Sequence, residues 1–154
     1  MWGNPDGSAR WATGWSNDES QSILLKYNGT GWETVWSRNG TSVPPYGDFV
    51  TSVWATDSLF LGSGRAVFKD TTQVIVLPWF PYRIRGTANN NIAVAGDEGM
   101  IWHWSGVDWK QLNLQSGQPL YSVAISKTMI VAVGSDFNIG FGAALIYLGK
   151  RNSN

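Results

Sequence analysis

Four apolar segments of the sequence end in glycine and recur at intervals of a few tens of residues. They are RWATG at 10–14, LFLG at 59–62, IAVAG at 92–96 and IVAVG at 130–134. The spacings between the final glycines are 48, 34 and 38 residues. Intervals of this length are typical of β-propeller blades, each built from four short strands. This repeat constrains the fold more tightly than any other feature of the chain.

The rest of the repeat consists of further short apolar and aromatic runs. After each glycine a polar loop leads into ILLKY at 23–27, AVFK at 66–69, MIWHW at 100–104 or ALIYL at 144–148. Outer runs follow at 32–37, 73–79 and 109–114, and inner runs precede three of the glycine segments at 48–55, 82–88 and 120–126. Runs of this kind, bounded by Gly, Asn, Asp and Pro, predict strands, and we find no helical period. We expect one domain over residues 1–154, with repeats at about 1–38, 48–79, 82–114 and 120–149.

Two copies share a tight turn between their last two strands. In each turn an aromatic residue is followed by Asn or Ser, Gly, two further residues and Trp. The glycines, Gly29 and Gly106, are expected to supply a positive φ, and Trp32 and Trp109 to cover the edge of the blade.

The number of repeats is not whole. The first copy has only Met1-Trp2-Gly3 for an inner strand, and the fourth stops at RNSN before an outer strand. The predicted fold is all-β and β-propeller-like, with about three and a half to four blades of four antiparallel strands. A four-bladed ring, an arc completed by a second copy and a fragment of a longer protein remain open. We favour self-association, as a two-fold pair of about eight blades, because an open arc would expose the flanks of its terminal blades.

Composition excludes several classes of partner. The net charge is zero, with 11 basic and 11 acidic residues and no basic run, so we expect no nucleic-acid binding. No apolar run is long enough to span a membrane. There is no Cys and no EF-hand pattern, and we expect neither a metal site nor a cofactor. The 10 Trp residues exceed the needs of one small core, which indicates repeated packing elements or a binding surface.

The segments from Ala93 to Trp109 and from Trp11 to Trp32 resemble the repeats of bacterial β-propeller proteins, whose unit is strand–G–loop–aliphatic–aromatic–x–G–x–x–W. The second copy departs from this unit, with Asp-Thr-Thr-Gln at 70–73 in place of the Gly and Trp. The turns also faintly resemble the Asp-box of sialidase-type propellers. These resemblances imply a propeller fold and favour a secreted or cell-surface protein. Residues 1–11 lack the basic and apolar regions of a signal peptide, which does not decide the compartment. The resemblances do not specify a function.

Aromatic loop residues are the leading candidates for ligand binding. Trp79, Phe80 and Tyr82 lie in a Pro-bounded segment between an outer strand and the next inner strand, where propellers present binding loops. Trp15 and Phe137 follow the glycine segments and are expected on the same face. Such rings can stack on a sugar or anchor a protein partner. The alternative is that they only pack between blades.

Charged residues provide the other candidates. Paired acids follow two glycine segments, Asp18 with Glu19 and Asp97 with Glu98, and Asp136 occupies a further loop. Arg83 and Arg85 lie two apart in one strand and are therefore expected to point to one side, toward a polar central channel. The single histidine, His103, is expected to be a packed or exposed strand residue rather than a catalytic one.

We therefore predict a non-enzymatic binding or scaffold module that recognises a glycan or a protein through the loops of one face. One alternative is a glycosidase- or sialidase-like enzyme fragment that uses the loop acids together with Arg83 and Arg85. A second alternative is a purely structural assembly subunit.

Overall fold

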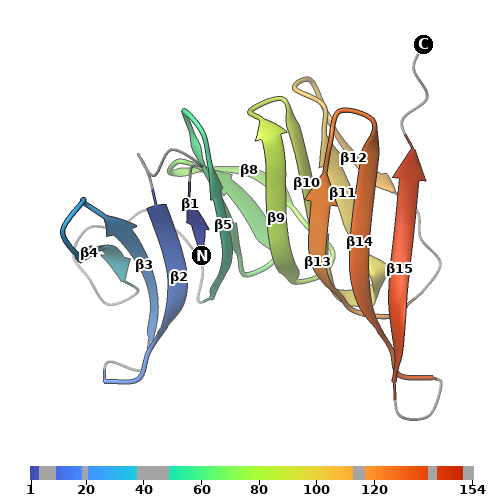
Figure 1. Ribbon diagram of the computed structural model, residues 1–154, viewed down its shortest axis with the longest axis horizontal. Helices are drawn as coiled ribbons and strands as arrows, with labels where there is room; N and C mark the ends of the chain where they lie inside the picture. Colours follow the sequence, from blue (N-terminus) through green and yellow to red (C-terminus); the bar gives the residue numbers. More distant parts are fainter. Residues whose placement is uncertain (4–9, 19–20, 38–48, 113–116, 139–141, 151–154) are drawn as a thin grey trace. The chain divides into compact units, whose positions relative to one another are not determined.

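The computed structural model describes residues 1–3, 10–18, 21–37, 49–112, 117–138 and 142–150. The chain divides into two compact units, Met1–Leu77 and Pro78–Asn154. Each unit contains two antiparallel sheets (Figure 1).

The first unit contains sheets A and B. Sheet A consists of β1 (Trp2–Gly3), β2 (Arg10–Ser16), β3 (Gln21–Tyr27) and β4 (Trp32–Ser37). Sheet B consists of β5 (Val50–Ala55), β6 (Leu59–Ser63), β7 (Ala66–Lys69) and β8 (Thr72–Val76). One face of sheet A packs on sheet B through a core that includes Leu24 and Trp36 from sheet A and Val53, Leu61 and Phe68 from sheet B.

The second unit contains sheets C and D. Sheet C consists of β9 (Pro81–Ala88), β10 (Asn91–Gly96), β11 (Ile101–Trp104) and β12 (Trp109–Leu112), and sheet D of β13 (Leu120–Ile125), β14 (Met129–Asp136) and β15 (Ala143–Lys150). The innermost strands β9 and β13 lie side by side (Figure 1). The core between the sheets includes Ala93, Ala95 and Ile101 from sheet C and Leu120, Val123 and Ala132 from sheet D.

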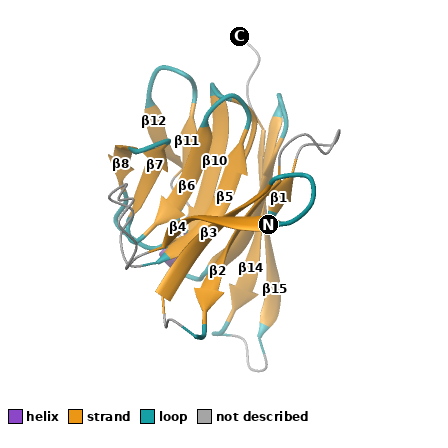
Figure 2. Ribbon diagram, turned by 90° about the vertical axis from the view of Figure 1, so that its left-hand side faces the viewer, coloured by secondary structure: helices purple, strands orange, loops and turns teal. Residues whose placement is uncertain are grey.

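The predicted fold class is confirmed. In every sheet the strands are antiparallel and follow one another in chain order, as in propeller blades. β1 is a two-residue strand, and sheet D has three strands in the described part of the chain. Strands dominate the described structure (Figure 2), and the expected absence of helix needs one correction, a single 3₁₀ turn η1 at Asp97–Gly99. No helix among the described residues is long and apolar enough to cross a membrane.

The repeated glycines have a steric cause in the second unit. A Cβ atom on Gly96 would lie 2.1 Å from the carbonyl oxygen of Phe80, and one on Gly134 would lie 1.9 Å from that of Pro119. These glycines are therefore required by close approach of the next inner strand. In sheet B the alignment of the glycine segments was wrong by one residue. Ser63, and not Gly62, pairs with the start of the inner strand, as Gly96 does in sheet C. Glycine is thus not obligatory at this position of every sheet.

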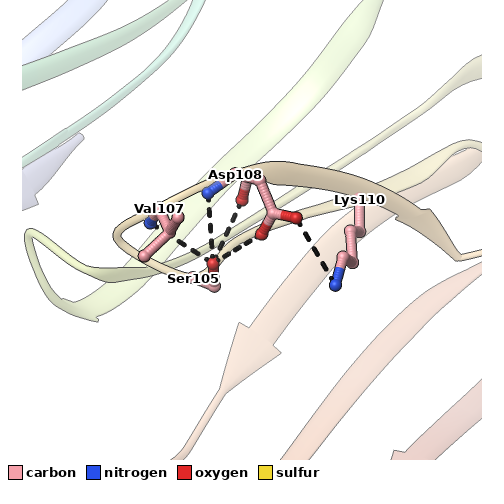
Figure 3. A network of polar contacts seen from close by, with 4 residues as sticks. All are labelled: Ser105, Val107, Asp108 and Lys110. Carbon is pink, nitrogen blue, oxygen red and sulfur yellow. Dashed lines mark hydrogen bonds and ion pairs between the residues drawn. The ribbon is translucent and has the colours of Figure 1, made fainter.

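The two matching turns are closed by local hydrogen bonds. Gly29 and Gly106 adopt φ values of 104° and 96°, which glycine tolerates best. The Asn28 carboxamide oxygen accepts hydrogen bonds from the N–H groups of Thr30 and Gly31. Ser105 has the same role in sheet C, where its hydroxyl accepts from the N–H groups at 107 and 108 and donates to the Asp108 carboxylate at 2.7 Å (Figure 3). In each turn the polar side chain at the first position therefore accepts hydrogen bonds from two backbone N–H groups, in addition to the backbone hydrogen bond that closes the turn.

The aromatic residues beside these turns pair across the strands. The rings of Tyr27 and Trp32 are 5.5 Å apart between centroids, and those of Trp104 and Trp109 are 5.6 Å apart. Both pairs are directly opposed in the strand register. The Trp of the shared turn pattern thus packs on the aromatic residue that begins it.

Candidate functional site

The loops at one end of the second unit are joined by hydrogen bonds. This loop end comprises residues 79–82, 97–100, 118–121 and 136–137, around the starts of β9 and β13 at the lower end of these strands in Figure 1. The Asp97 N–H donates to the Phe80 carbonyl at 3.1 Å, and the Gly99 N–H donates to the Gln118 carbonyl at 2.7 Å. The Gln118 side-chain oxygen accepts from the Phe137 N–H at 3.1 Å. Hydrogen bonds therefore connect four separate segments of the chain.

Aromatic side chains dominate the loop end. We call Trp79, Phe80, Tyr82, Tyr121 and Phe137 the aromatic loop cluster. Four of these rings are between 44% and 61% exposed, and the fifth, Tyr82, is half-buried. The rings of Tyr82 and Tyr121 are in contact, with centroids 5.6 Å apart. Exposed aromatic rings on backbone segments that hydrogen bonds hold in place are typical of binding surfaces.

The loop end is negatively charged. Burial, a hydrogen bond to the Asp97 carboxylate and the charge of that carboxylate raise the pKa of Tyr82 above its ordinary value, so this phenol is neutral at physiological pH. Glu98 adopts a φ of 54°, unusual for a residue with a side chain, and its carboxylate reaches toward Gly117. Asp136 ends β14 and accepts from the Asn138 N–H at 2.9 Å. The loop end therefore carries three carboxylates, of which Asp97 interacts directly with Tyr82.

Arg83 and Arg85 lie elsewhere on β9. They pair with Ala95 and Ala93, so they share the face of sheet C that packs on sheet D. Burial, and then the charge of Arg83, lower the pKa of Arg85 below its ordinary value. The Nε atom of Arg83 is buried without a hydrogen-bond partner in the described part of the chain. The two guanidinium groups thus flank the sheet C–sheet D junction, and their role in ligand binding stays a prediction.

His103 is a packing residue at the opposite end of the unit. Its Nε2 lies 2.9 Å from Asn91 Oδ1, and because the Asn91 amide donates to Thr87 and Ser126, the histidine N–H donates to Asn91. Both side chains line a cavity of about 140 Å³ between sheets C and D, whose other walls are mostly apolar: Leu112, Ile125, Ser126, Met129, Ile130, Gly149 and Lys150. No carboxylate lines this cavity, so the described walls offer no acid–base partner for the imidazole.

The remaining predicted residues belong to the first unit. Trp15 lies in β2 and stacks on Phe49, with ring centroids 5.5 Å apart and planes 17° from parallel. Both rings are about half exposed. Asp18 lies in the turn after β2, and Glu19 lies outside the described residues.

Sequence reasoning missed three residues of these surfaces. Tyr121 follows the first residue of β13 as Tyr82 follows the first residue of β9, so an alignment of the inner strands would have identified it. Phe49 is similarly related to Phe80, because each precedes an inner strand and its carbonyl accepts from the loop after the neighbouring strand. Gln118 carries no pattern that distinguishes it in the sequence.

Comparison with known proteins supports the fold. The chain matches no family model, and no curated protein is similar to it in sequence. It is similar to a solved structure, "YCF48 bound to D1 peptide", with a TM-score of 0.58 and 19% identity over 90% of this chain. That neighbour is a β-propeller. This chain has a β-propeller-like fold. It spans about half the length of the neighbour, since the match covers 49% of that chain.

Proposed function

We propose that the chain is a non-enzymatic binding module whose aromatic loop cluster holds an extended segment of another protein. The proposal is carried by the exposure of Trp79, Phe80, Tyr121 and Phe137 on loops joined by hydrogen bonds. Aromatic rings are enriched at the centres of protein interfaces, where they provide large contact areas at low entropic cost.

The negative charge of the loop end indicates which kind of protein segment would bind. Asp97, Glu98 and Asp136 belong to the same loop end as the rings, and exposed aromatic faces attract cations. A segment with apolar residues and one or more Lys or Arg side chains would therefore fit the cluster best. The structural neighbour was solved with a bound peptide, which supports a protein segment rather than a glycan as the ligand.

The binding test is a selection from a random peptide library. We expect enrichment of peptides that combine basic and apolar residues, with affinities that fall about tenfold or more in Trp79→Ala and Phe137→Ala. The matched control is Val107→Ala, because Val107 is 88% exposed but lies in the β11–β12 turn.

Two outcomes would overturn the proposal. One is selected peptides whose binding is unchanged by the cluster variants. The other is binding on a glycan array that is lost in Trp79→Ala, which would assign the cluster to carbohydrate recognition instead.

We also propose that the module self-associates. The support is that sheet D has three strands in the described residues and exposes apolar side chains on β14 and β15. Exposed sheet edges and apolar faces favour association. The mass of the protein in solution tests this proposal separately from peptide binding.

A further inference from the structure

Sheets C and D can be aligned position by position, and the alignment shows which face of sheet D is left uncovered. Gly96 and Gly134 each lie against the carbonyl that precedes the inner strand, so the residues before them are equivalent. The pair Ala95–Ile101 of sheet C therefore corresponds to Val133–Ile146 of sheet D. Two residues further along, Ala93–His103 corresponds to Val131–Leu148.

These positions are buried in one sheet and exposed in the other. Ala93 and Ala95 are fully buried and Ile101 is 2% exposed, because this face of sheet C packs on sheet D. On sheet D, Val133 is 39%, Ile146 63% and Leu148 69% exposed. We call this surface of sheet D the open face.

The open face is mostly apolar. The residues of β13 that pair with Val133 and Val131 are Ser122 and Ala124, so the centre of the face carries no charge. Lys150, which pairs with Met129, lies at the end of the face. No strand among the described residues pairs with the second edge of β15. A neighbour could therefore both pack on the face and hydrogen-bond to the edge.

Sheet A provides the matching surface. Leu24 lies on the face of sheet A that packs on sheet B. Because side chains alternate along a strand, the opposite face carries the neighbouring cross-strand pairs Ala12–Leu25 and Gly14–Ile23. This receiving face is uncharged around these pairs, and its side chains are only partly buried. Arg10 lies at its end, over the ring of Tyr27. It corresponds to the face that sheet B presents to sheet A and that sheet D presents to sheet C.

We propose that the open face of sheet D docks on the receiving face of sheet A of a second copy of this chain. The inference rests on the proposed self-association and names its surfaces. The occupant is a second copy because the same face-to-face junction already occurs twice within the chain, A on B and C on D, with equivalent positions at each contact. A closed pair forms two identical head-to-tail junctions, so that both copies bury both faces.

The experiment measures native mass and the dissociation constant of the pair by analytical ultracentrifugation. The wild-type chain should have twice the 16.9 kDa of one copy at micromolar concentration. Ile146→Asp, at an exposed site, should raise the dissociation constant by at least about tenfold. Gly14→Asp should do the same, and it should fold because a Cβ atom at Gly14 meets nothing within 4 Å. Val107→Asp is the control for added charge, with no expected change.

A mixture of the two variants tests the head-to-tail arrangement. Ile146→Asp retains a native receiving face and Gly14→Asp a native open face, so one unmodified junction can form between them. We therefore expect the mixture to associate more tightly than either variant alone.

Three results would overturn the inference in different ways. A monomeric wild-type chain would end both the self-association proposal and the interface. A dimer that resists both variants would retain self-association but reject these surfaces. A dimer sensitive to Ile146→Asp and insensitive to Gly14→Asp would show that two open faces pair with each other.

Discussion

Ile101 in sheet C and Ile146 in sheet D have the same side chain at the same position of the repeat, yet one is 2% exposed and the other 63%. Both lie on third strands, and both pair with a small or β-branched residue of the second strand. The difference arises because sheet D covers the face of sheet C, whereas the same face of sheet D carries no sheet in the described structure. Equivalent residues therefore stabilise the fold in one sheet and form an exposed apolar surface in the other.

The largest expected difference in the free energy of unfolding is between alanine substitutions of these two isoleucines. Ile101→Ala should lower the free energy of unfolding by about 2–5 kcal/mol, because it leaves a cavity between two packed sheets. Ile146→Ala should cost less than about 1 kcal/mol in the monomer, since an exposed side chain leaves no cavity. Urea unfolding at protein concentrations below association measures both values. Equal costs would contradict the comparison and show that the open face is covered within one chain.

A smaller difference in the free energy of unfolding is expected between His103 of sheet C and Leu148 of sheet D, two residues further along the third strands. His103→Ala should cost about 1–3 kcal/mol, because Asn91 Oδ1 loses its buried donor. Leu148→Ala, at the equivalent exposed position, should change the free energy of unfolding by no more than about 0.5 kcal/mol. His103→Gln keeps a donor and should recover part of the loss. If His103→Gln is as destabilising as His103→Ala, the hydrogen bond is not the cause.

The smallest effect is expected for a charged group in the β11–β12 turn of sheet C, outside both the packed face of sheet C and the open face of sheet D. The Ser105 hydroxyl, and then Lys110, hold the pKa of Asp108 below its ordinary value of 3.8. The stabilising contribution of this carboxylate is present above that ordinary value, and it is lost as the pH falls through the lowered pKa. Ser105→Ala should raise the pKa of Asp108, and Lys110→Ala should raise it less. NMR titration of the Asp108 carboxyl carbon measures both shifts, and an unchanged pKa in Ser105→Ala would reject the assigned cause.

The local structure could largely be predicted from short patterns. The turns at Gly29 and Gly106 follow from residues within six positions of one another, because turn geometry depends on local dihedral angles. The strands could be predicted from short apolar and aromatic runs bounded by turn residues. The all-β fold could be predicted from the number and length of these strands. The glycine alignment was wrong by one residue in sheet B, because Ser63 occupies the position of Gly96 and Gly134, and the adjacent Gly62 was aligned in its place.

The candidate site could be predicted only in part. Trp79, Phe80 and Phe137 stand out in the sequence because they are large rings in loops bounded by Pro or Gly. Tyr121 contacts Tyr82 only because the fold brings β13 beside β9. Gln118 joins two loops through hydrogen bonds that no local pattern specifies.

The sequence by itself determined the strands, their tight turns and which residues share a face, since a period of two and a positive φ are local properties of the chain. Only the tertiary structure decided which faces are covered. Ala95 and Val133 both precede a repeated glycine, but the burial of Ala95 and the exposure of Val133 depend on the strands that lie across them. Those contacts join residues far apart in sequence, and alternation carries no information about them.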